Sequence, residues 1–327
     1  MAAVMPHSSP SLLVIRLDAI GDALALTPLL AALAQRDIPV DLVMRSVNAG
    51  IFSSRAARHV YVAPFALRSS TAANRRAIAQ FGRALRPTAY SHVLVATEDP
   101  GGYRLARTIG APNRVGFVNG WGKPFKTLWA GSMLTKRIVR SAGLDARAPH
   151  ECAVLWELGA SLVGDAPIPR DASVLRPFVL ERDPGRANHA VVQVSDKWER
   201  LGIAFGEVVE AIAAAGAVMP LRAIAAQSEG AYADRVAAAA NVPIERFASL
   251  EPWKEAIAEA AALVAPDSGA VHVAGMTGTP VIAVFPPIAD YALQTARWAP
   301  WAAPYRLIRA SNGWPAAAVQ ALASFRA

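Results

Sequence analysis

Short apolar runs rich in β-branched residues alternate with longer segments of helical spacing, and this alternation occurs twice along the chain. In the first half, strands are predicted at 12–16, 40–44, 60–63 and 90–96, and helices at 23–36 and 71–85. In the second half, strands are predicted at 189–194, 218–223, 262–265 and 280–285, and helices at 204–215, 228–239, 252–261 and 270–276. Such alternation predicts βαβ units and parallel sheets.

The middle of the chain interrupts this pattern. Residues 117–130 contain glycine and proline breaks and aromatic residues, which predicts an irregular loop, and a helix is expected at 148–163. Residues 164–187 contain four prolines and several charges, which indicates an interdomain linker. We therefore expect an α/β protein of two Rossmann-like domains, residues 1–165 and 166–327. Because open α/β sheets bind ligands at the carboxyl ends of their strands, both should face one central cleft.

Composition narrows the class of protein. Hydrophobic residues make up 54% and charged residues 18%, which argues against disorder. The 33 basic and 25 acidic side chains give a net charge of +8, which favours a phosphate-bearing substrate, a nucleic acid or an anionic membrane over a neutral partner. An ordinary arginine-rich surface is the alternative. The basic residues look scattered and no nucleic-acid motif is present, so no nucleic-acid partner is expected.

The lone cysteine and the apolar segments bear on location. Cys152 excludes an intrachain disulfide and a thiolate zinc cluster, and we expect it to be a buried apolar residue on a helix rather than a reactive thiol. The N-terminus lacks the pattern of a signal peptide. Residues 208–226 are the most apolar long window, but Glu210, Pro220 and Arg222 interrupt it, which argues against a membrane span. We expect a protein that is located in the cytoplasm and is able to contact a membrane peripherally.

A first candidate site is the loop at residues 16–22 (RLDAIGD), between a strand and a helix. Gly21 permits a tight turn or a close approach of another segment. Asp22 stands where a helix N-cap belongs; it is either that cap or a carboxylate that accepts a proton from a hydroxyl at the mouth of the cleft. Asp18 is a second carboxylate or an ordinary turn residue. The loop lacks the Gly-x-Gly-x-x-Gly dinucleotide fingerprint.

A second candidate site is residues 266–272 (PDSGAVH), followed by Gly-Thr-Pro at 278–280. The backbone N–H groups at 268–270 would begin a helix and form an anion site suited to a diphosphate. Asp267 could accept hydrogen bonds from sugar hydroxyls, and His272 could donate one to a phosphate. The alternative is a capped helix with an ordinary core histidine.

Two further segments carry basic residues. In residues 194–198 (VSDKW), Lys197 could pair with a phosphate and Ser195 could hydrogen-bond to it; the alternative is a solvated lysine with Trp198 packed nearby. Residues 120–126 (GWGKPFK) could hold an acidic sugar or a lipid headgroup, or form an ordinary loop.

Together these segments resemble a known family. Residues 12–33 (LLVIRLDAIGDALALTPLLAAL) resemble the opening of the ADP-heptose:lipopolysaccharide heptosyltransferases, glycosyltransferase family 9, and residues 266–285 (PDSGAVHVAGMTGTPVIAVF) resemble their donor-binding signature. The resemblance spans most of the chain. It implies a GT-B fold and inverting, metal-independent transfer without a cofactor. It also implies a nucleotide-sugar donor such as ADP-heptose, a lipopolysaccharide-core or related glycolipid acceptor, and peripheral contact with the cytoplasmic face of the inner membrane.

The resemblance also implies roles for single residues. Asp22 matches the general base, and Asp267 matches the residue that holds the donor sugar. Expected donor contacts are Ser195, Lys197, Ser268, Gly269 and His272, and expected acceptor contacts are Arg16, Asp18, Gly21, Lys123 and Lys126.

Two departures touch the nucleotide pocket. No proline follows Trp198, and residues 221–227 (LRAIAAQ) replace a glycine-rich stretch. The donor base and sugar therefore stay open. The alternatives are a transferase with another donor or a protein acceptor, a non-catalytic nucleotide-sugar-binding protein, and an oxidoreductase, which the missing dinucleotide fingerprint disfavours.

Overall fold

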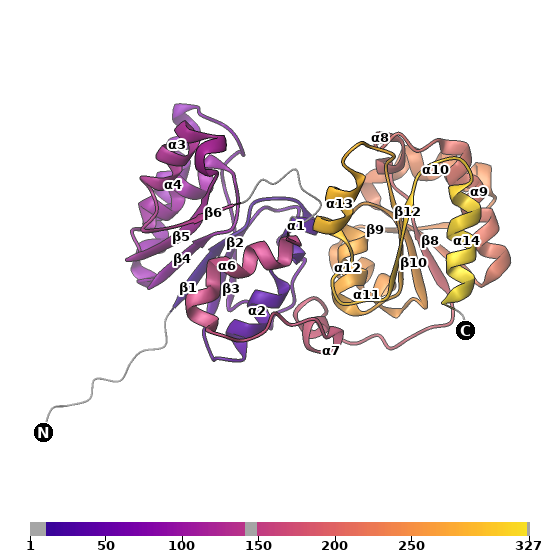
Figure 1. Cartoon of the computed structure of the whole chain (residues 1–327), viewed down its shortest axis with the longest axis horizontal. Coiled ribbons are helices and arrows are strands. Elements are labelled where there is room, and N and C mark those ends of the chain that lie inside the picture. Colours follow the sequence, from indigo (N-terminus) through magenta and orange to yellow (C-terminus); the bar gives the residue numbers. More distant parts are fainter. Residues whose placement is uncertain (1–10, 141–148, 326–327) are drawn as a thin grey trace, which may run out of the picture.

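The computed structural model describes residues 11–140 and 149–325, which form two six-stranded parallel sheets side by side (Figure 1). The strand orders are β3-β2-β1-β4-β5-β6 and β12-β11-β10-β7-β8-β9. The first sheet consists of β1 (Leu12–Ile15), β2 (Val40–Met44), β3 (His59–Val62), β4 (His92–Val95), β5 (Asn113–Val118) and β6 (Lys136–Val139). The second consists of β7 (Ala190–Gln193), β8 (Leu221–Ala226), β9 (Ile244–Phe247), β10 (Ala262–Pro266), β11 (Val281–Phe285) and β12 (Tyr305–Arg309). The predicted pair of Rossmann-like α/β domains is confirmed.

Both sheets have the same internal order, because each domain's first strand lies beside its fourth. In the first domain β1 pairs with β4, and in the second β7 pairs with β10. This neighbouring pair is the topological switch point, where the connections leave in opposite directions and open a crevice at the carboxyl ends of the strands. The sequence loops after β1 and β10 therefore both lead to a switch point.

Helices cover the two faces of each sheet. They are α1 (Ile20–Leu24), α2 (Thr27–Ala34), α3 (Ala72–Leu85), α4 (Pro100–Ile109), α5 (Pro124–Gly131), α6 (Glu151–Val163), α7 (Ala172–Leu175), α8 (Lys197–Arg200), α9 (Phe205–Val218), α10 (Gly230–Ala240), α11 (Leu250–Glu259), α12 (Gly269–Thr277), α13 (Tyr291–Trp298) and α14 (Trp314–Ser324). The central strands are buried along their whole length, since helices pack on both faces. Cys152 lies on α6 and is buried, as predicted. Among the described residues, no helix has the length and hydrophobicity of a membrane span.

Several predicted elements of the first domain are wrong. The helix expected at 23–36 begins earlier, at Ile20, and is split into α1 and α2, because Pro28 in the first turn of α2 has no N–H to continue an existing helix. The irregular loop expected at 117–130 instead holds the end of β5, a short 3-10 turn and α5. No helix was expected after the strand at 90–96, but α4 begins at Pro100, where Asp99 caps it by accepting the N–H of Gly101.

In the second domain, one strand is misplaced and several elements were missed. The strand expected at 218–223 lies at Leu221–Ala226, because Val218 still belongs to α9 and Pro220 separates the two elements. The sequence analysis missed β9, β12, α13 and α14 in this domain, and β5 and β6 in the first domain. Residues 164–187 cross from the first sheet to the second, with the short helix α7 within them.

The domains are packed against each other rather than merely linked. One cluster of buried apolar residues contains members of both domains. At one edge of the interface, Lys254 of α11 is fully buried, and its ammonium donates to the carbonyls of Gly50 (3.1 Å), Ile51 (3.2 Å) and Val179 (2.7 Å). Burial lowers the pKa of Lys254. The lysine thus joins the second domain to a first-domain loop and to the connecting segment.

Candidate functional site

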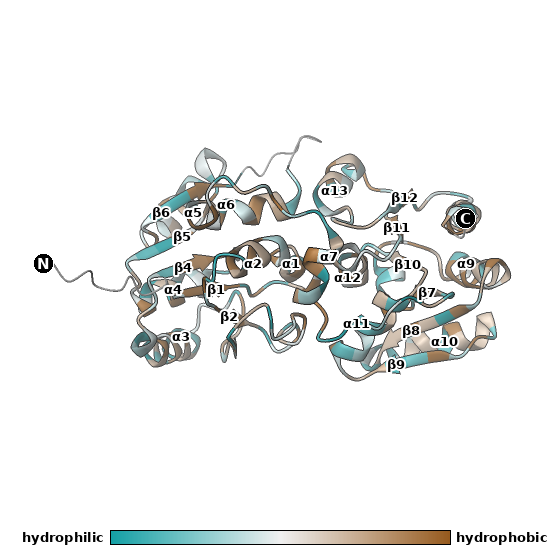
Figure 2. Cartoon of the chain, turned by 90° about the horizontal axis from the view of Figure 1, so that it is seen from below, coloured by the Kyte–Doolittle hydropathy of each residue, from teal (hydrophilic) through white to brown (hydrophobic). Residues whose placement is uncertain are grey.

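The helices that follow β1 and β10 meet at their N-terminal ends, one from each domain (Figures 1 and 2). Two glycines allow this approach. A Cβ atom on Gly21 would lie 2.4 Å from Cδ2 of His272, and one on Gly269 would lie 2.8 Å from Cγ2 of Ile20. Both distances are too short for a side chain, so glycine at these positions permits the close contact. The structure therefore brings the two predicted loops together at one place.

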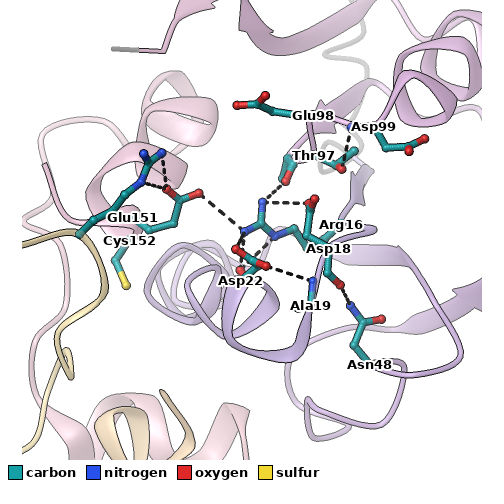
Figure 3. Close-up of polar contacts among 12 residues, drawn as sticks. Arg16, Asp18, Ala19, Asp22, Asn48, Thr97, Glu98, Asp99, Glu151 and Cys152 are labelled. Atoms are coloured by element: carbon teal, nitrogen blue, oxygen red, sulfur yellow. Dashed lines mark hydrogen bonds and ion pairs between the residues drawn. The ribbon is translucent and has the colours of Figure 1, made fainter. Parts of the chain in front are cut away.

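Asp22 lies in this contact region, at the third position of α1 rather than at its N-cap, which is Ala19 (Figure 3). Its Oδ2 accepts a hydrogen bond from the N–H of Ala19 at 3.1 Å, so the carboxylate does stabilise the helix start. Its Oδ1 lies 3.8 Å from Nη2 of Arg16, and the side chain is 31% exposed. One oxygen thus holds the helix, while the other is accessible for a proton from an acceptor.

Arg16 lies beneath Asp22 and is 2% exposed. Its Nε (3.0 Å) and Nη2 (2.6 Å) both donate to the carbonyl oxygen of Asp22, and Nη1 donates to the carbonyl of Ala96. These bonds fix the backbone that carries the Asp22 carboxylate. Arg16 was expected to contact an acceptor, but its burial and its three hydrogen bonds to backbone carbonyls favour a role in positioning Asp22.

Asp18 lies in the same loop and is as partly buried as Asp22. Burial raises the pKa of its carboxyl group, against the opposing charge of Arg16, whose Nη1 is 3.4 Å from Oδ2. Oδ2 has no hydrogen-bond partner among the described residues. The Asp18 carbonyl accepts a hydrogen bond of 2.7 Å from Asn48. The side chain therefore has an unused acceptor beside Asp22.

The sequence reasoning missed Glu151, a nearly fully buried carboxylate on α6 that lies among three arginines. Arg140 donates two hydrogen bonds to it, at 2.8 and 2.7 Å, and Arg16 lies at 3.7 Å. Arg297, on α13 of the second domain, lies at 3.2 Å. Figure 3 shows the carboxylate of Glu151 directed toward Arg16 of the Asp22 loop. Its sequence context is only that of an acidic residue in the first turn of a helix.

On the second domain, Asp267 follows β10 and faces the contact region. Burial raises the pKa of its carboxyl group; the positive charge of Lys197 opposes this shift and the negative charge of Asp22 adds to it. Both neighbours are thus close enough to act on Asp267. The hydroxyl of Ser268 is buried and has no hydrogen-bond partner among the described residues. A buried, unpaired donor at the start of the nine-residue helix α12 is suited to an anionic oxygen of a ligand.

His272 is buried on the first turn of α12, against Gly21 of the other domain. Burial lowers its pKa to about 3, with further contributions from His150 and Lys197. Its ring makes an edge contact with Trp298 at 5.7 Å between centroids. The imidazole is therefore neutral at pH 7. It can supply a hydrogen bond to a phosphate but not a positive charge.

Lys197 begins the short helix α8 and is half-buried; its ammonium makes no hydrogen bond or ion pair with another described residue. Ser195 is less free than expected. Its hydroxyl donates to Glu229 at 2.9 Å and accepts the N–H of Lys197 at 3.1 Å. Glu229, which the sequence reasoning missed, also accepts the N–H of Asp196 at 2.9 Å. Glu229 and Ser195 therefore hold the loop that presents Lys197.

A cavity of about 1050 Å³ lies between the domains, beside this contact region. It lies at the carboxyl ends of β2, β7, β8 and β9, and is largely apolar. Its lining residues are Ile20, Ser46, Val47, Gly50, Phe52, Glu181, Gln193, Ala226, Gln227, Ser228, Phe247, Ala248, Ser249, Leu250, Glu251 and Trp253. None was predicted as a site residue, although Ile20 adjoins Gly21 and Gln193 precedes the Lys197 loop. Its volume is in the range of small-molecule and cofactor sites, or slightly above it.

The remaining predicted acceptor residues lie farther along the first domain. Lys123 is exposed, and Lys126 on α5 forms an ion pair with Glu98 at 2.8 Å. Burial raises the pKa of Glu98, but the hydrogen bond from Lys126 and the charge of Arg140 outweigh it, and the net pKa is lowered. Arg140 contacts both Glu98 and Glu151, so a chain of alternating charges connects α5 to the Asp22 loop.

Comparisons with known proteins agree with this geometry. Residues 197–325 match the family model described as glycosyltransferase family 9 (heptosyltransferase). Three solved structures have the same fold. A glycosyltransferase family 9 protein from Veillonella parvula has 13% identity and a TM-score of 0.74 over 98% of each chain. Escherichia coli heptosyltransferase WaaC with ADP has 20% identity and a TM-score of 0.66 over 96% of this chain and 99% of that one. Escherichia coli ADP-heptose lipopolysaccharide heptosyltransferase II has 16% identity and a TM-score of 0.70 over 97% and 98%.

No curated protein matches the chain in sequence. The predicted resemblance to the family is confirmed by the model match in the second half of the chain, and the predicted GT-B arrangement by the structural matches over its whole length.

Proposed function

We propose that this chain is a glycosyltransferase that transfers a sugar from a nucleoside-diphosphate donor to an acceptor hydroxyl, with inversion at the anomeric carbon. The match of residues 197–325 to the family 9 model and the shared fold support this proposal. One observation carries the proposal: Asp22 of the first domain and the Asp267–His272 turn of the second lie against each other across the domain interface. A base and a phosphate-binding turn must meet in this way if an acceptor bound to one domain is to attack a donor bound to the other.

In this proposal the donor binds to the second domain. Its diphosphate lies at the N-terminus of α12, where the Ser268 hydroxyl, the first backbone N–H groups and Lys197 converge. Asp267 accepts hydrogen bonds from the sugar hydroxyls, and the interdomain cavity takes the nucleoside. ADP-heptose is the proposed donor, supported by structures of WaaC that contain ADP and ADP-2-deoxy-2-fluoro heptose.

Asp22 is the proposed base. Its carboxylate takes the proton of the acceptor hydroxyl, and the oxygen attacks the anomeric carbon from the face opposite the diphosphate. The bond from that carbon to the phosphate oxygen breaks, and the nucleoside diphosphate leaves with the electron pair. Lys197 stabilises the charge that develops on the leaving group, and neutral His272 donates a hydrogen bond to it. Arg16 holds the Asp22 backbone in place throughout.

In this proposal the acceptor binds to the first domain, which is strongly basic. Residues 42–140 contain 16 lysines and arginines against two acidic residues, so the basic residues are concentrated and not scattered as the sequence interpretation held. Such a surface favours a phosphorylated glycan or glycolipid, and we propose an acceptor of the lipopolysaccharide-core type at the cytoplasmic face of the inner membrane. Residues 1–165 would then form the acceptor domain and residues 166–327 the donor domain.

A panel of ADP-, GDP- and UDP-sugars tests the donor assignment. We expect ADP-heptose to raise the melting temperature most, because a ligand that binds the native state stabilises it, and Ser268→Ala to reduce that rise. Transfer is then measured as nucleoside diphosphate release with and without acceptor. A larger rise with GDP- or UDP-sugars would reject ADP-heptose. Donor binding without transfer to any glycan, glycolipid or protein acceptor would favour the non-catalytic alternative.

A further inference from the structure

The four most exposed large apolar side chains of the described residues lie together on the first domain. Trp121 is 95% exposed, Phe125 86%, Leu128 71% and Val139 66%, whereas no other large apolar side chain exceeds 49%. We name these four residues the apolar patch. Single exposed apolar residues are ordinary, but a contiguous group marks an interaction site.

The patch is continuous across three elements. Phe125 and Leu128 are three positions apart on α5 and so share one face of the helix. Trp121 lies in the 3-10 turn that precedes α5, and the hydroxyl of Thr127 ties the two by donating to the carbonyl of Gly120 at 2.9 Å. Val139 ends the edge strand β6, and its Cγ1 would be 3.3 Å from a Cβ on Gly120. Figure 2 shows α5 and β6 beside each other on the first domain.

Positive charge surrounds the patch. Residues 100–140 contain eight lysines and arginines and no aspartate or glutamate. Lys123, Lys136 and Arg137 are exposed and make no ion pair with another described residue. Exposed aromatic and aliphatic side chains on a segment that also carries exposed, unpaired cations are typical of surfaces that insert into anionic bilayers. A protein partner with an apolar face would not need this excess of unpaired positive charge.

We propose that the apolar patch docks the enzyme on an anionic lipid bilayer, with Trp121, Phe125 and Leu128 entering the interfacial layer. The opposite face of α5 carries Lys126, which leads through Glu98 and Arg140 to the Asp22 loop. When the face of α5 that carries the apolar patch docks on the bilayer, the opposite face of α5, with Lys126, lies close to the membrane surface. The cleft that contains Asp22 then also lies near the membrane. A glycolipid acceptor would reach Asp22 without leaving the bilayer. The choice of a glycolipid rests on the proposed function; bilayer docking itself does not.

Co-sedimentation with vesicles tests the docking. The purified chain is mixed with phosphatidylethanolamine vesicles with and without phosphatidylglycerol, in the absence of donor and acceptor. We expect binding to the anionic vesicles, weakened by salt, and a loss of roughly 10-fold or more in the W121S/F125S/L128S variant. The matched control is I288S/Y305S, two partly exposed apolar residues of the second domain, which should bind as the parent does.

Three outcomes would overturn the proposal. They are the absence of binding to anionic vesicles, equal binding by the patch variant and the parent, and concentration-dependent dimerisation of the parent that the patch variant abolishes. The last would assign the patch to a second copy of the chain. The assay contains no sugar, so failed docking leaves the transferase proposal intact. Conversely, absent transfer to a detergent-soluble acceptor, with intact vesicle binding, would reject the transferase proposal alone.

Discussion

The two domains share one strand order yet offer different chemistry to the cleft. Residues 1–165 hold 19 basic and 10 acidic side chains, and residues 166–327 hold 14 and 15. In the first domain, Asp22 is held by a network of buried charges around Arg16 and Glu151. In the second, the corresponding edge offers backbone N–H groups, the Ser268 hydroxyl and a neutral imidazole, with Lys197 as the main charge. The same fold therefore supports a charge-based site and a site built mostly from neutral donors.

This difference has a physical reason. A diphosphate brings its own charge, and a helix N-terminus binds it with fixed dipoles that need no counter-ion. A catalytic carboxylate is different, because it must be held at one position while remaining able to take a proton. The hydrogen bonds of Arg16 to the backbone carbonyl of Asp22 hold the residue in place without engaging both carboxylate oxygens. Substitutions in the buried charge network of the first domain and at the helix N-terminus of the second should therefore have different effects.

The largest effect is expected at Asp22. Asp22→Asn keeps the size of the side chain but cannot accept a proton, so kcat should fall by about 100-fold or more. Donor-induced thermal stabilisation should be unchanged, because donor binding belongs to the other domain. Asp37→Asn, at an exposed position of the first domain, is the control. Near-normal turnover in Asp22→Asn would remove this residue from the mechanism.

Glu151→Gln tests the buried charge network. Removing this carboxylate leaves three arginines with reduced compensation, and the expected loss is about 3 kcal/mol in the free energy of unfolding. Urea unfolding measures it, with the exposed residue Glu157 on the same helix changed to Gln as the control. If Glu151→Gln lowered the free energy of unfolding as little as Glu157→Gln does, the buried charge network would contribute little to stability. The first domain would then not differ from the second in depending on buried charges.

His272 gives the second domain a pH dependence. Its pKa is about 3 in the folded protein and near the ordinary value when unfolded, so the unfolded chain binds the proton first as the pH falls below about 6.5. Stability should be fully present above that pH and about 2 kcal/mol lower at pH 5. Other buried groups titrate in this range, so the measurement is the difference from His272→Gln. Parallel stability curves for the two proteins would show that the imidazole is not held neutral.

Ser268→Ala should have the smallest effect. It should weaken donor binding but should not destabilise the free protein. The buried hydroxyl has no partner, so its removal should leave stability unchanged or raise it by up to about 1 kcal/mol. Donor affinity, measured by calorimetry, should fall about 5–10-fold, because the variant lacks the hydroxyl that is proposed to hydrogen-bond to the donor phosphate. Exposed Ser311→Ala is the control. Unchanged donor affinity would place the diphosphate elsewhere.

The sequence predicted best where one short segment contains a whole functional unit. The Asp22 loop and the Asp267–His272 turn each follow a buried strand and start a helix, so their residues and their neighbourhood could be inferred together. Three of the four edge strands (β6, β9 and β12) were missed because edge strands such as Lys136–Val139 are largely exposed and lack an apolar run; only β3 was predicted. Glu151 and Glu229 could not be recognised, because their partners lie far away in the chain. The cavity is assembled from several loops of both domains, and no local pattern marks it.

Lys254 has a consequence for how the cleft can open. Its ammonium donates to three carbonyl groups of the first domain and the connecting segment, and separating them would break these three bonds and leave only the ion pair with Glu251 of its own helix. At the α6–α13 side, Arg297 can leave while Glu151 keeps Arg140 and Arg16. Opening the cleft at the Lys254 edge would therefore break three hydrogen bonds of a buried ammonium, whereas opening it on the other side would break the Arg297–Glu151 ion pair and the hydrogen bond between His150 and the carbonyl of Ala299.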